Sequence, residues 1–263
     1  MKPQTIRANG IDICYRLEGP ANAPVVMFSK SLLTDLGMWD MQVEALAAGL
    51  RMLRYDTRGH GGSGASDGAY TIDLLADDAL ALLDALRIER AHFVGLSLGG
   101  MIAQRVAARR HERIAKLVLC DTACHMPPES AWNDRIALAR SKGTAAFIGP
   151  MTERWLTAPF RAANPAVLDR LGAMIARTSV AGLVGCASAI RDMNQHDILA
   201  RIAAPTLVVV GEHDVGTPVA AARVLRDAIA GARMTIVADA GHLPNIEHPV
   251  AFNRVLVDFL ASR

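Results

Sequence analysis

The pentapeptide Gly-Leu-Ser-Leu-Gly, residues 95–99, stands between an apolar run at 91–94 and a stretch of helical periodicity. This order predicts a strand, a sharp turn and a helix, with Ser97 at the apex of the turn. Such a turn strains the backbone at the serine, and small residues two positions before and after it let the helix pack back across the strand. Gly95 and Gly99 meet this need. We therefore expect the Ser97 hydroxyl to stand clear of the sheet.

The remaining sequence alternates short apolar runs with stretches of helical periodicity. This alternation predicts an α/β fold with a mostly parallel, doubly wound sheet, since several of the runs are apolar throughout. An antiparallel hairpin is expected near Asn9-Gly10. The expected strands are 11–16, 24–29, 51–55, 91–96, 114–120, 205–211 and 233–237, and the expected helices are 38–48, 72–86, 98–109, 219–230 and 250–260.

The alternation stops between residues 125 and 197. This segment has no strand-like run and is interrupted by several prolines, which predicts a few short helices. A helical insertion after a strand lies over the ligand crevice of an open α/β sheet, where it can act as a lid. The expected organisation is therefore a core made of residues 1–124 and 198–263, with a helical lid at 125–197.

Composition limits the partners. The 263 residues are 51% hydrophobic and carry a net charge of +2, which suits one large α/β domain and provides no field to attract nucleic acid or an anionic membrane. The longest apolar runs are far shorter than the roughly 20 residues of a membrane span, and the N-terminus lacks the apolar core of a signal peptide. These features predict a cytoplasmic protein with a small-molecule partner, and they leave monomer and homo-oligomer open.

The four cysteines, Cys14, Cys120, Cys124 and Cys186, include no C-x-x-C pair. Zinc sites and redox motifs usually contain such a pair, and the chain has no second pair to complete a zinc site. The cysteines are therefore expected to be buried thiols without a metal or redox role.

A serine hydroxyl becomes a good nucleophile only beside a base, and that base needs an acid to fix its tautomer. His242 is the predicted base, because it follows the apolar run at 233–237 and precedes the last helical stretch. Asp214 follows the run at 205–211 and is the predicted acid, since it directly precedes the last helix, strand and histidine. Asp121 also ends an apolar run and is the alternative acid.

Two amides are predicted to bind the oxyanion of a tetrahedral intermediate. One belongs to Leu98, directly after the serine, and the other is expected in the loop at 29–34, where we assign it to Leu32. Ser31 in the same loop is expected to contact the substrate. Lys30 is expected to be a solvated or loop-bracing side chain, with the binding of an anionic substrate as the alternative.

The remaining histidines are expected to be structural or solvated. His60 lies in the glycine-rich stretch 58–64, which lacks both a Gly-Lys-Ser/Thr ending and G-x-G-x-x-G spacing. A tight turn after the apolar run at 51–55 is therefore expected there, and not a phosphate-binding loop.

The serine, aspartate and histidine motifs together resemble the α/β-hydrolase fold over the whole chain. More narrowly, the sequence resembles the bacterial 3-oxoadipate enol-lactonases of the β-ketoadipate pathway, at residues 34–40, 53–61, 95–101 and 153–155. One departure concerns the oxyanion loop. Where those lactonases usually have Ser-Asn-Ser-Leu-Gly-Thr, this chain has Ser-Lys-Ser-Leu-Leu-Thr at 29–34.

This resemblance implies hydrolysis of a carboxylate-bearing enol-lactone to 3-oxoadipate through an acyl-enzyme, without a metal or cofactor. The substrate carboxylate needs a cation, and the lid offers Arg135, Arg154 and Arg191, of which the first two are preferred. Trp132 and Trp155 are expected to form apolar walls around the guanidinium groups. The alternatives are a broad carboxylesterase or perhydrolase of the same fold, and a small-molecule receptor that has kept the fold without the activity.

Overall fold

The computed structural model describes residues 2–47 and 49–261, and within them eight strands form one sheet in the order β1-β2-β4-β3-β5-β6-β7-β8. The β1–β2 and β2–β4 pairs are antiparallel, and all other neighbours are parallel. The strands are β1 (Gln4–Ala8), β2 (Ile11–Glu18), β3 (Val25–Ser29), β4 (Arg51–Tyr55), β5 (Ala91–Leu96), β6 (Ile114–Cys120), β7 (Thr206–Gly211) and β8 (Arg233–Val237).

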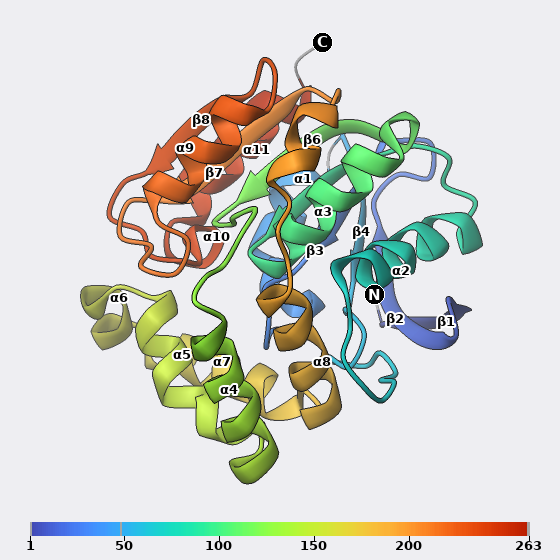
Figure 1. Cartoon of the computed structure of the whole chain (residues 1–263). Coiled ribbons are helices and arrows are strands. Elements are labelled where there is room, and N and C mark those ends of the chain that lie inside the picture. The colour runs from blue at the N-terminus through green and yellow to red at the C-terminus, as the bar shows by residue number, and fades with distance from the viewer. Residues whose placement is uncertain (1, 48, 262–263) are drawn as a thin grey trace.

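Helices flank this sheet (Figure 1). Helix α1 packs against α11, whereas α2 packs against α3, which also contacts β5 and β6. Of the helix expected at 38–48, the structure forms η1 (Leu36–Trp39) and α1, and residue 48 lies outside the described residues. The helices of the core are α1 (Asp40–Leu46), α2 (Ile72–Ala85), α3 (Leu98–Arg109), η2 (His111–Arg113), α9 (Val219–Ala228), α10 (Pro244–Glu247) and α11 (Pro249–Ala261).

The central strands are buried on both faces. Every residue of β5 and of β7 is buried, which is why these strands are almost continuously apolar. The four cysteines are also buried, and each is a free thiol. The carboxyl ends of β5, β6 and β7 lie side by side, so residues that follow these strands meet at one edge of the sheet.

A group of helices follows β6 and lies below the sheet in the view of Figure 1. Its two ends are joined to each other, because His125 forms an isolated bridge with Asn194 and the amide of Gln195 donates to the carbonyl of Cys124 at 2.8 Å. The elements are α4 (Glu129–Lys142), η3 (Thr144–Phe147), α5 (Ile148–Trp155), α6 (Ala158–Ala163), α7 (Pro165–Arg177), α8 (Val180–Arg191) and η4 (His196–Arg201).

No single described helix has the length and apolar composition needed to cross a membrane. Helices α7 and α8 reach that length and composition only together, across a 93° bend.

One buried ion pair joins α2 to the turn after β4. Arg58 donates from Nε to Asp78 Oδ2 at 2.8 Å and from Nη2 to Asp78 Oδ1 at 2.5 Å, and both side chains are almost fully buried. Removing one partner of such a pair leaves an uncompensated buried charge, whereas exposed pairs contribute little to stability. Asp73 on the same helix forms an exposed pair with Arg109 at 2.9 Å and provides a matched control.

We expect Asp78→Ala to lower the free energy of unfolding by about 3 to 5 kcal/mol, because it leaves the Arg58 guanidinium unpaired in the interior. Asp73→Ala should lower it by no more than about 1 kcal/mol. Urea denaturation of the two variants measures this difference. Equal losses in both variants would show that the Arg58–Asp78 pair is solvated in solution.

Candidate active site

The turn between β5 and α3 has the strained geometry that its sequence predicts. Ser97 has φ +56° and ψ −117°, a backbone conformation that residues with a side chain rarely adopt. A Cβ atom added at Gly95 would lie 2.3 Å from the carbonyl oxygen of Gly99, and one added at Gly99 would lie 2.1 Å from that of Ser29. Glycine is therefore required on both sides of the serine for α3 to pack this closely against β3 and β5.

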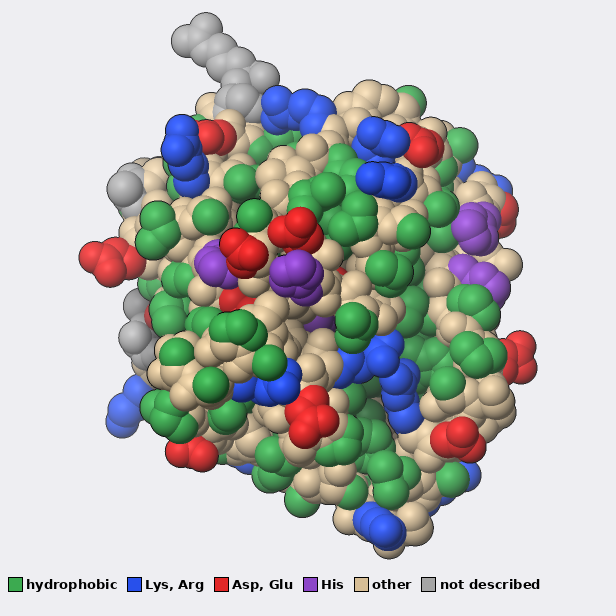
Figure 2. Space-filling model, turned by 90° about the vertical axis from the view of Figure 1, so that its left-hand side faces the viewer, with side chains coloured by type: hydrophobic (Ala, Val, Ile, Leu, Met, Phe, Trp, Pro, Cys, Tyr) green, Lys and Arg blue, Asp and Glu red, His purple; other side chains and the backbone are tan. Residues whose placement is uncertain are grey.

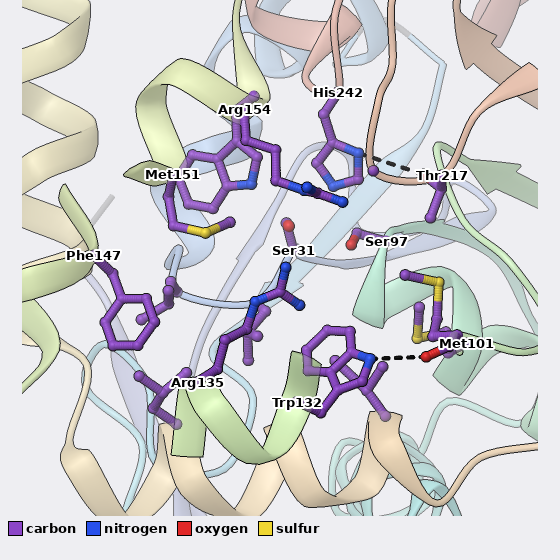
Figure 3. A pocket seen from close by; sticks show the side chains of 17 residues that line it. Ser31, Ser97, Met101, Trp132, Arg135, Phe147, Met151, Arg154, Thr217 and His242 are labelled. Atoms are coloured by element: carbon purple, nitrogen blue, oxygen red, sulfur yellow. Dashed lines mark hydrogen bonds between the residues drawn. The ribbon is translucent and has the colours of Figure 1, made fainter. Parts of the chain in front are cut away.

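Asp214 and His242 meet at the same edge of the sheet. The Nδ1 atom of His242 lies 2.8 Å from Oδ2 of Asp214, and both side chains are buried. Because the carboxylate can only accept, Nδ1 carries the proton and leaves Nε2 free to act as a base. Ser97 and His242 line one cavity, and Figure 3 shows both side chains directed into it.

Thr217 is a further partner of the acid, and the sequence analysis did not identify it. Its hydroxyl donates to Asp214 Oδ2 at 2.6 Å, while the amides of Gly216 and Thr217 donate to Oδ1 at 2.7 and 3.1 Å. Burial alone would raise the pKa of Asp214, but the charge and hydrogen bond of His242, together with Thr217, hold that pKa well below its usual range. Asp214 is therefore a fully hydrogen-bonded carboxylate.

Asp121, the alternative acid, is close to this pair but does not make the contact with Nδ1. One of its carboxylate oxygens, one of Asp214 and one ring nitrogen of His242 all lie within 4.8 Å of one another. Its own contact is the amide of Gly211, which donates to Oδ1 at 2.8 Å. The structure thus places Asp214 against Nδ1 of His242, and Asp121 close to both but bound to the amide of Gly211.

The loop after β3 and the first residue of α3 each bring one free amide close to Ser97. In the part of the chain that the structure describes, the amides of Leu32 and Leu98 have no acceptor, whereas that of Leu33 donates to Nε2 of His60 at 3.1 Å. Nε2 therefore accepts, and Nδ1 of His60 donates to the carbonyl of Arg58 at 3.1 Å. Burial and then the charge of Lys30 hold the pKa of His60 well below its usual value, so this ring stays neutral. His60 therefore braces the loop after β3, which fits the expectation of a structural histidine. Nothing in the sequence indicated its contact with Leu33.

Lys30 is fully buried, so the expectation of a solvated side chain is wrong and that of a loop brace fits. Its Nζ atom donates to the carbonyl of Ser31 at 3.4 Å, and the residue is not among those that line the cavity. Burial lowers the pKa of Lys30 to about 8, against the opposing charges of Asp56 and Asp35. The long apolar stem of lysine makes this burial possible.

The cavity is mainly apolar but contains two guanidinium groups. Arg135 lies over the ring of Trp132 at 4.3 Å from its centroid, and burial followed by the charge of Arg154 lowers its pKa. Arg154 donates to the carbonyl of Val215 at 3.4 Å. The lining residues are Ser31, Leu32, Leu33, Ser97, Met101, Met126, Trp132, Arg135, Phe147, Met151, Arg154, Trp155, Leu183, Ile190, Gly216, Thr217 and His242.

Among the described residues, neither Arg135 nor Arg154 has a carboxylate partner. Arg191 differs from both, because it pairs with Asp192 at 2.7 Å and does not line the cavity. In Figure 3, the guanidinium groups of Arg135 and Arg154 point toward the space in front of Ser31 and Ser97. Figure 2 shows basic side chains bordering a hollow on one face of the molecule. The cavity therefore combines a serine hydroxyl, an imidazole and two guanidinium groups that have no carboxylate partner among the described residues.

A strained serine between β5 and α3, with an aspartate–histidine pair at the same sheet edge, is an arrangement typical of hydrolase sites on an α/β fold. The chain belongs to the alpha/beta hydrolase fold family, whose model matches residues 24–249, and it is a hydrolase.

Similar proteins include enol-lactonases. The chain is 34% identical to 3-oxoadipate enol-lactonase 2 of Acinetobacter baylyi, over 96% of this chain and 94% of that protein. The crystal structure of the enol-lactonase from Burkholderia xenovorans LB400 matches with a TM-score of 0.96 and 40% identity, covering 98% of this chain and 100% of the other. A RutD protein of Pseudomonas savastanoi pv. phaseolicola, named for carbamate hydrolysis, is 32% identical over 92% of this chain and 96% of its own length.

Proposed function

We propose that the protein is a serine hydrolase that opens 3-oxoadipate enol-lactone to 3-oxoadipate, an intermediate of aromatic catabolism. The observation that carries this proposal is the presence of Arg135 and Arg154, without a carboxylate partner among the described residues, in the cavity that holds Ser97. A substrate with a carboxylate arm supplies the missing negative charge. Likeness to two enol-lactonases supports the same substrate class.

The residues present suffice for each step. His242 removes the proton of Ser97, whose oxygen attacks the lactone carbonyl, and the amides of Leu32 and Leu98 bind the resulting oxyanion. The ring C–O bond then breaks, and the enol oxygen leaves with a proton from His242 and becomes a ketone by tautomerisation. Water activated by His242 attacks the acyl-enzyme, which releases the new carboxylic acid and restores the Ser97 hydroxyl. Asp214 keeps the imidazole in the required tautomer throughout.

The helical segment at 125–197 acts in this proposal as a lid. It carries Trp132 and Arg135 on α4, and Arg154 and Trp155 on α5, so both candidate cations come from the inserted helices rather than from the sheet. The catalytic groups come from the core. Substrate specificity and bond cleavage therefore reside in different parts of the chain, which is common in folds that vary by insertion.

A broad carboxylesterase or perhydrolase is the second candidate. It is favoured by the apolar character of the cavity, where Met126, Phe147, Met151 and Leu183 offer no directional contacts. A receptor without activity is excluded, because the chain is a hydrolase.

We expect Arg135→Ala or Arg154→Ala to lower kcat/KM for the enol-lactone by roughly 10- to 150-fold, the equivalent of about 1.5 to 3 kcal/mol for a lost charge-assisted hydrogen bond. The same variant should barely change kcat/KM for a neutral aryl ester, because the groups that cleave the bond are intact. Arg191→Ala is the matched control, since that arginine pairs with Asp192 outside the cavity.

The methyl ester of the enol-lactone acid gives a second comparison. The wild-type protein should prefer the free acid, and the arginine variant should lose this preference. If both arginine variants affect charged and neutral substrates equally, or the wild type accepts acid and methyl ester alike, the enol-lactonase proposal fails and the broad esterase replaces it.

A further inference from the structure

A second buried carboxyl group stands beside the proposed triad and has no part in the mechanism above. Asp121 follows β6, is 1% exposed, and has a positive φ of +43° that directs the chain out of the strand. Its amide donates to the carbonyl of Val209 at 2.9 Å, so the residue is fixed against β7. One of its carboxyl oxygens lies within 4.8 Å of a carboxylate oxygen of Asp214 and of a ring nitrogen of His242.

The two carboxyl groups have very different surroundings. Asp214 accepts hydrogen bonds from His242, from the Thr217 hydroxyl and from two amides. Asp121 accepts one, from the amide of Gly211, and its Oδ2 atom is buried without a partner in the described part of the chain. A buried carboxylate needs several donors, whereas a carboxylic acid needs an acceptor for its O–H group. The donors therefore favour a charge on Asp214 and a proton on Asp121.

The charges around Asp121 also favour a charge on Asp214 and a proton on Asp121. Among the described residues, the ionisable groups that face it are Asp214, Glu247, Cys120 and His242, and of these the histidine alone can become positive. Burial, and next the charge of Asp214, raises the pKa of Asp121 well above its usual range. Two carboxylates this close in a dry site cannot both stay ionised without a large repulsion. These surroundings favour a single negative charge on the pair at neutral pH.

We propose that Asp121 is a proton-bearing positioning residue of the active site, which supports the Asp214 carboxylate through its O–H group and replaces it as the partner of His242 when position 214 is neutral. This inference rests on the serine, histidine and aspartate set of the proposed function. A proton on Asp121 lets the site hold a second carboxyl group without a second negative charge beside the imidazole. The unpartnered Oδ2 atom is then the oxygen that carries this proton.

Infrared difference spectroscopy tests the proton directly. The spectrum of the wild type minus that of Asp121→Asn at neutral pH should contain the C=O band of one protonated carboxylic acid, and this band should shift in D2O. Other buried carboxyl groups, Asp56 among them, are present in both proteins and cancel. This measurement needs no activity, so it is independent of the substrate and of the mechanism. A difference spectrum that shows only a lost carboxylate band would overturn the inference.

A double-mutant cycle tests the replacement, with a simple aryl ester as substrate. Asp121→Asn should lower kcat about threefold in the wild type but about thirtyfold in Asp214→Asn, and a coupling of about tenfold lies within the range for contacting residues. If Asp121 is purely structural, Asp121→Asn lowers kcat by the same factor in the wild type and in Asp214→Asn. That result would refute the idea that Asp121 replaces Asp214. Near-ultraviolet circular dichroism and thermal unfolding check that the variants are folded.

A third measurement leaves Asp121 unchanged. In Asp214→Asn, the charge that helps to raise the pKa of Asp121 is gone, so the residual kcat should increase with pH along an ionisation that the wild type lacks. A flat profile for that variant contradicts the inference. If Ser97→Ala still cleaves the aryl ester, the proposed function itself is wrong, whereas a loss with Ser97→Ala and no coupling at Asp121 removes only the present inference.

Discussion

Replacing Ser97 with alanine is expected to lower kcat for the enol-lactone and for a simple aryl ester by at least about 10³-fold, while the protein stays folded. In the proposed mechanism the hydroxyl supplies the covalent step, and no other hydroxyl among the described lining residues combines a strained turn, the free amide of Leu98 and the imidazole of His242. The loss should be the same for charged and neutral substrates, since both need the nucleophile. Steady-state kinetics with both substrates measure it.

A serine outside the cavity provides the control. Ser188 is buried on α8, where its hydroxyl donates to the carbonyl of Val184 at 2.9 Å, and Ser188→Ala should keep both activities. Thermal unfolding of Ser97→Ala should stay close to the wild type, because alanine keeps the strained backbone and removes only one oxygen. Near wild-type cleavage by a folded Ser97→Ala protein would place the nucleophile elsewhere.

The fold could be predicted because its signals are local. The prediction of a mostly parallel, doubly wound sheet in an α/β-hydrolase fold is confirmed, and the runs at 91–96 and 114–120 coincide with β5 and β6. These strands are apolar throughout because both of their faces are covered, so periodicity alone finds them. Strand β1 was harder to define, because it is an exposed edge strand with little apolar alternation, and only the turn at Asn9-Gly10 indicated it.

The inserted helices show a second local signal. Prolines at 159 and 165 stand in the first turns of α6 and α7, where the ring fits the helix and the missing N–H is not needed. Trp132 and Arg135 are three residues apart on α4 and so share one face of that helix, which brings their side chains together over the cavity. The lid role of this segment stays a prediction.

Contacts between distant segments could not be predicted. The burial of Lys30 depends on the packing of the loop after β3 against the turn after β4, and His60 reaches Leu33 across 27 positions of sequence. Neither residue belongs to a periodic pattern, so its burial and its partners could not be predicted, and its expected role followed from its residue type alone. The expected roles of Ser31, Leu32 and Leu98 likewise stay predictions, since substrate contacts depend on a ligand and not on the local sequence.

Replacing Asp214 with asparagine is expected to lower kcat by about 10³- to 10⁴-fold at neutral pH. The amides of Gly216 and Thr217 donate to Oδ1, so the amide oxygen of an asparagine takes that place and its NH2 group faces Nδ1 of His242. An N–H donor there stabilises the tautomer with the proton on Nε2, which cannot accept the proton of Ser97. The variant therefore keeps its nucleophile and oxyanion donors, but in most molecules His242 has the tautomer that cannot act as a base.

Comparing the loss of kcat in Asp214→Asn with the loss in Asp121→Asn decides which carboxyl group orients the imidazole. Asp227→Asn, which changes an exposed aspartate on α9, controls for the loss of one negative charge and should have little effect on kcat. Asp121→Asn should cost far less than Asp214→Asn, because the wild-type His242 contacts Asp214 at 2.8 Å. The reverse order, with both variants folded, would assign the acid to the end of β6. Asp214 accepts four hydrogen bonds, one of them from His242. A purely structural aspartate does not need a histidine donor, so the reverse order would leave this contact unexplained.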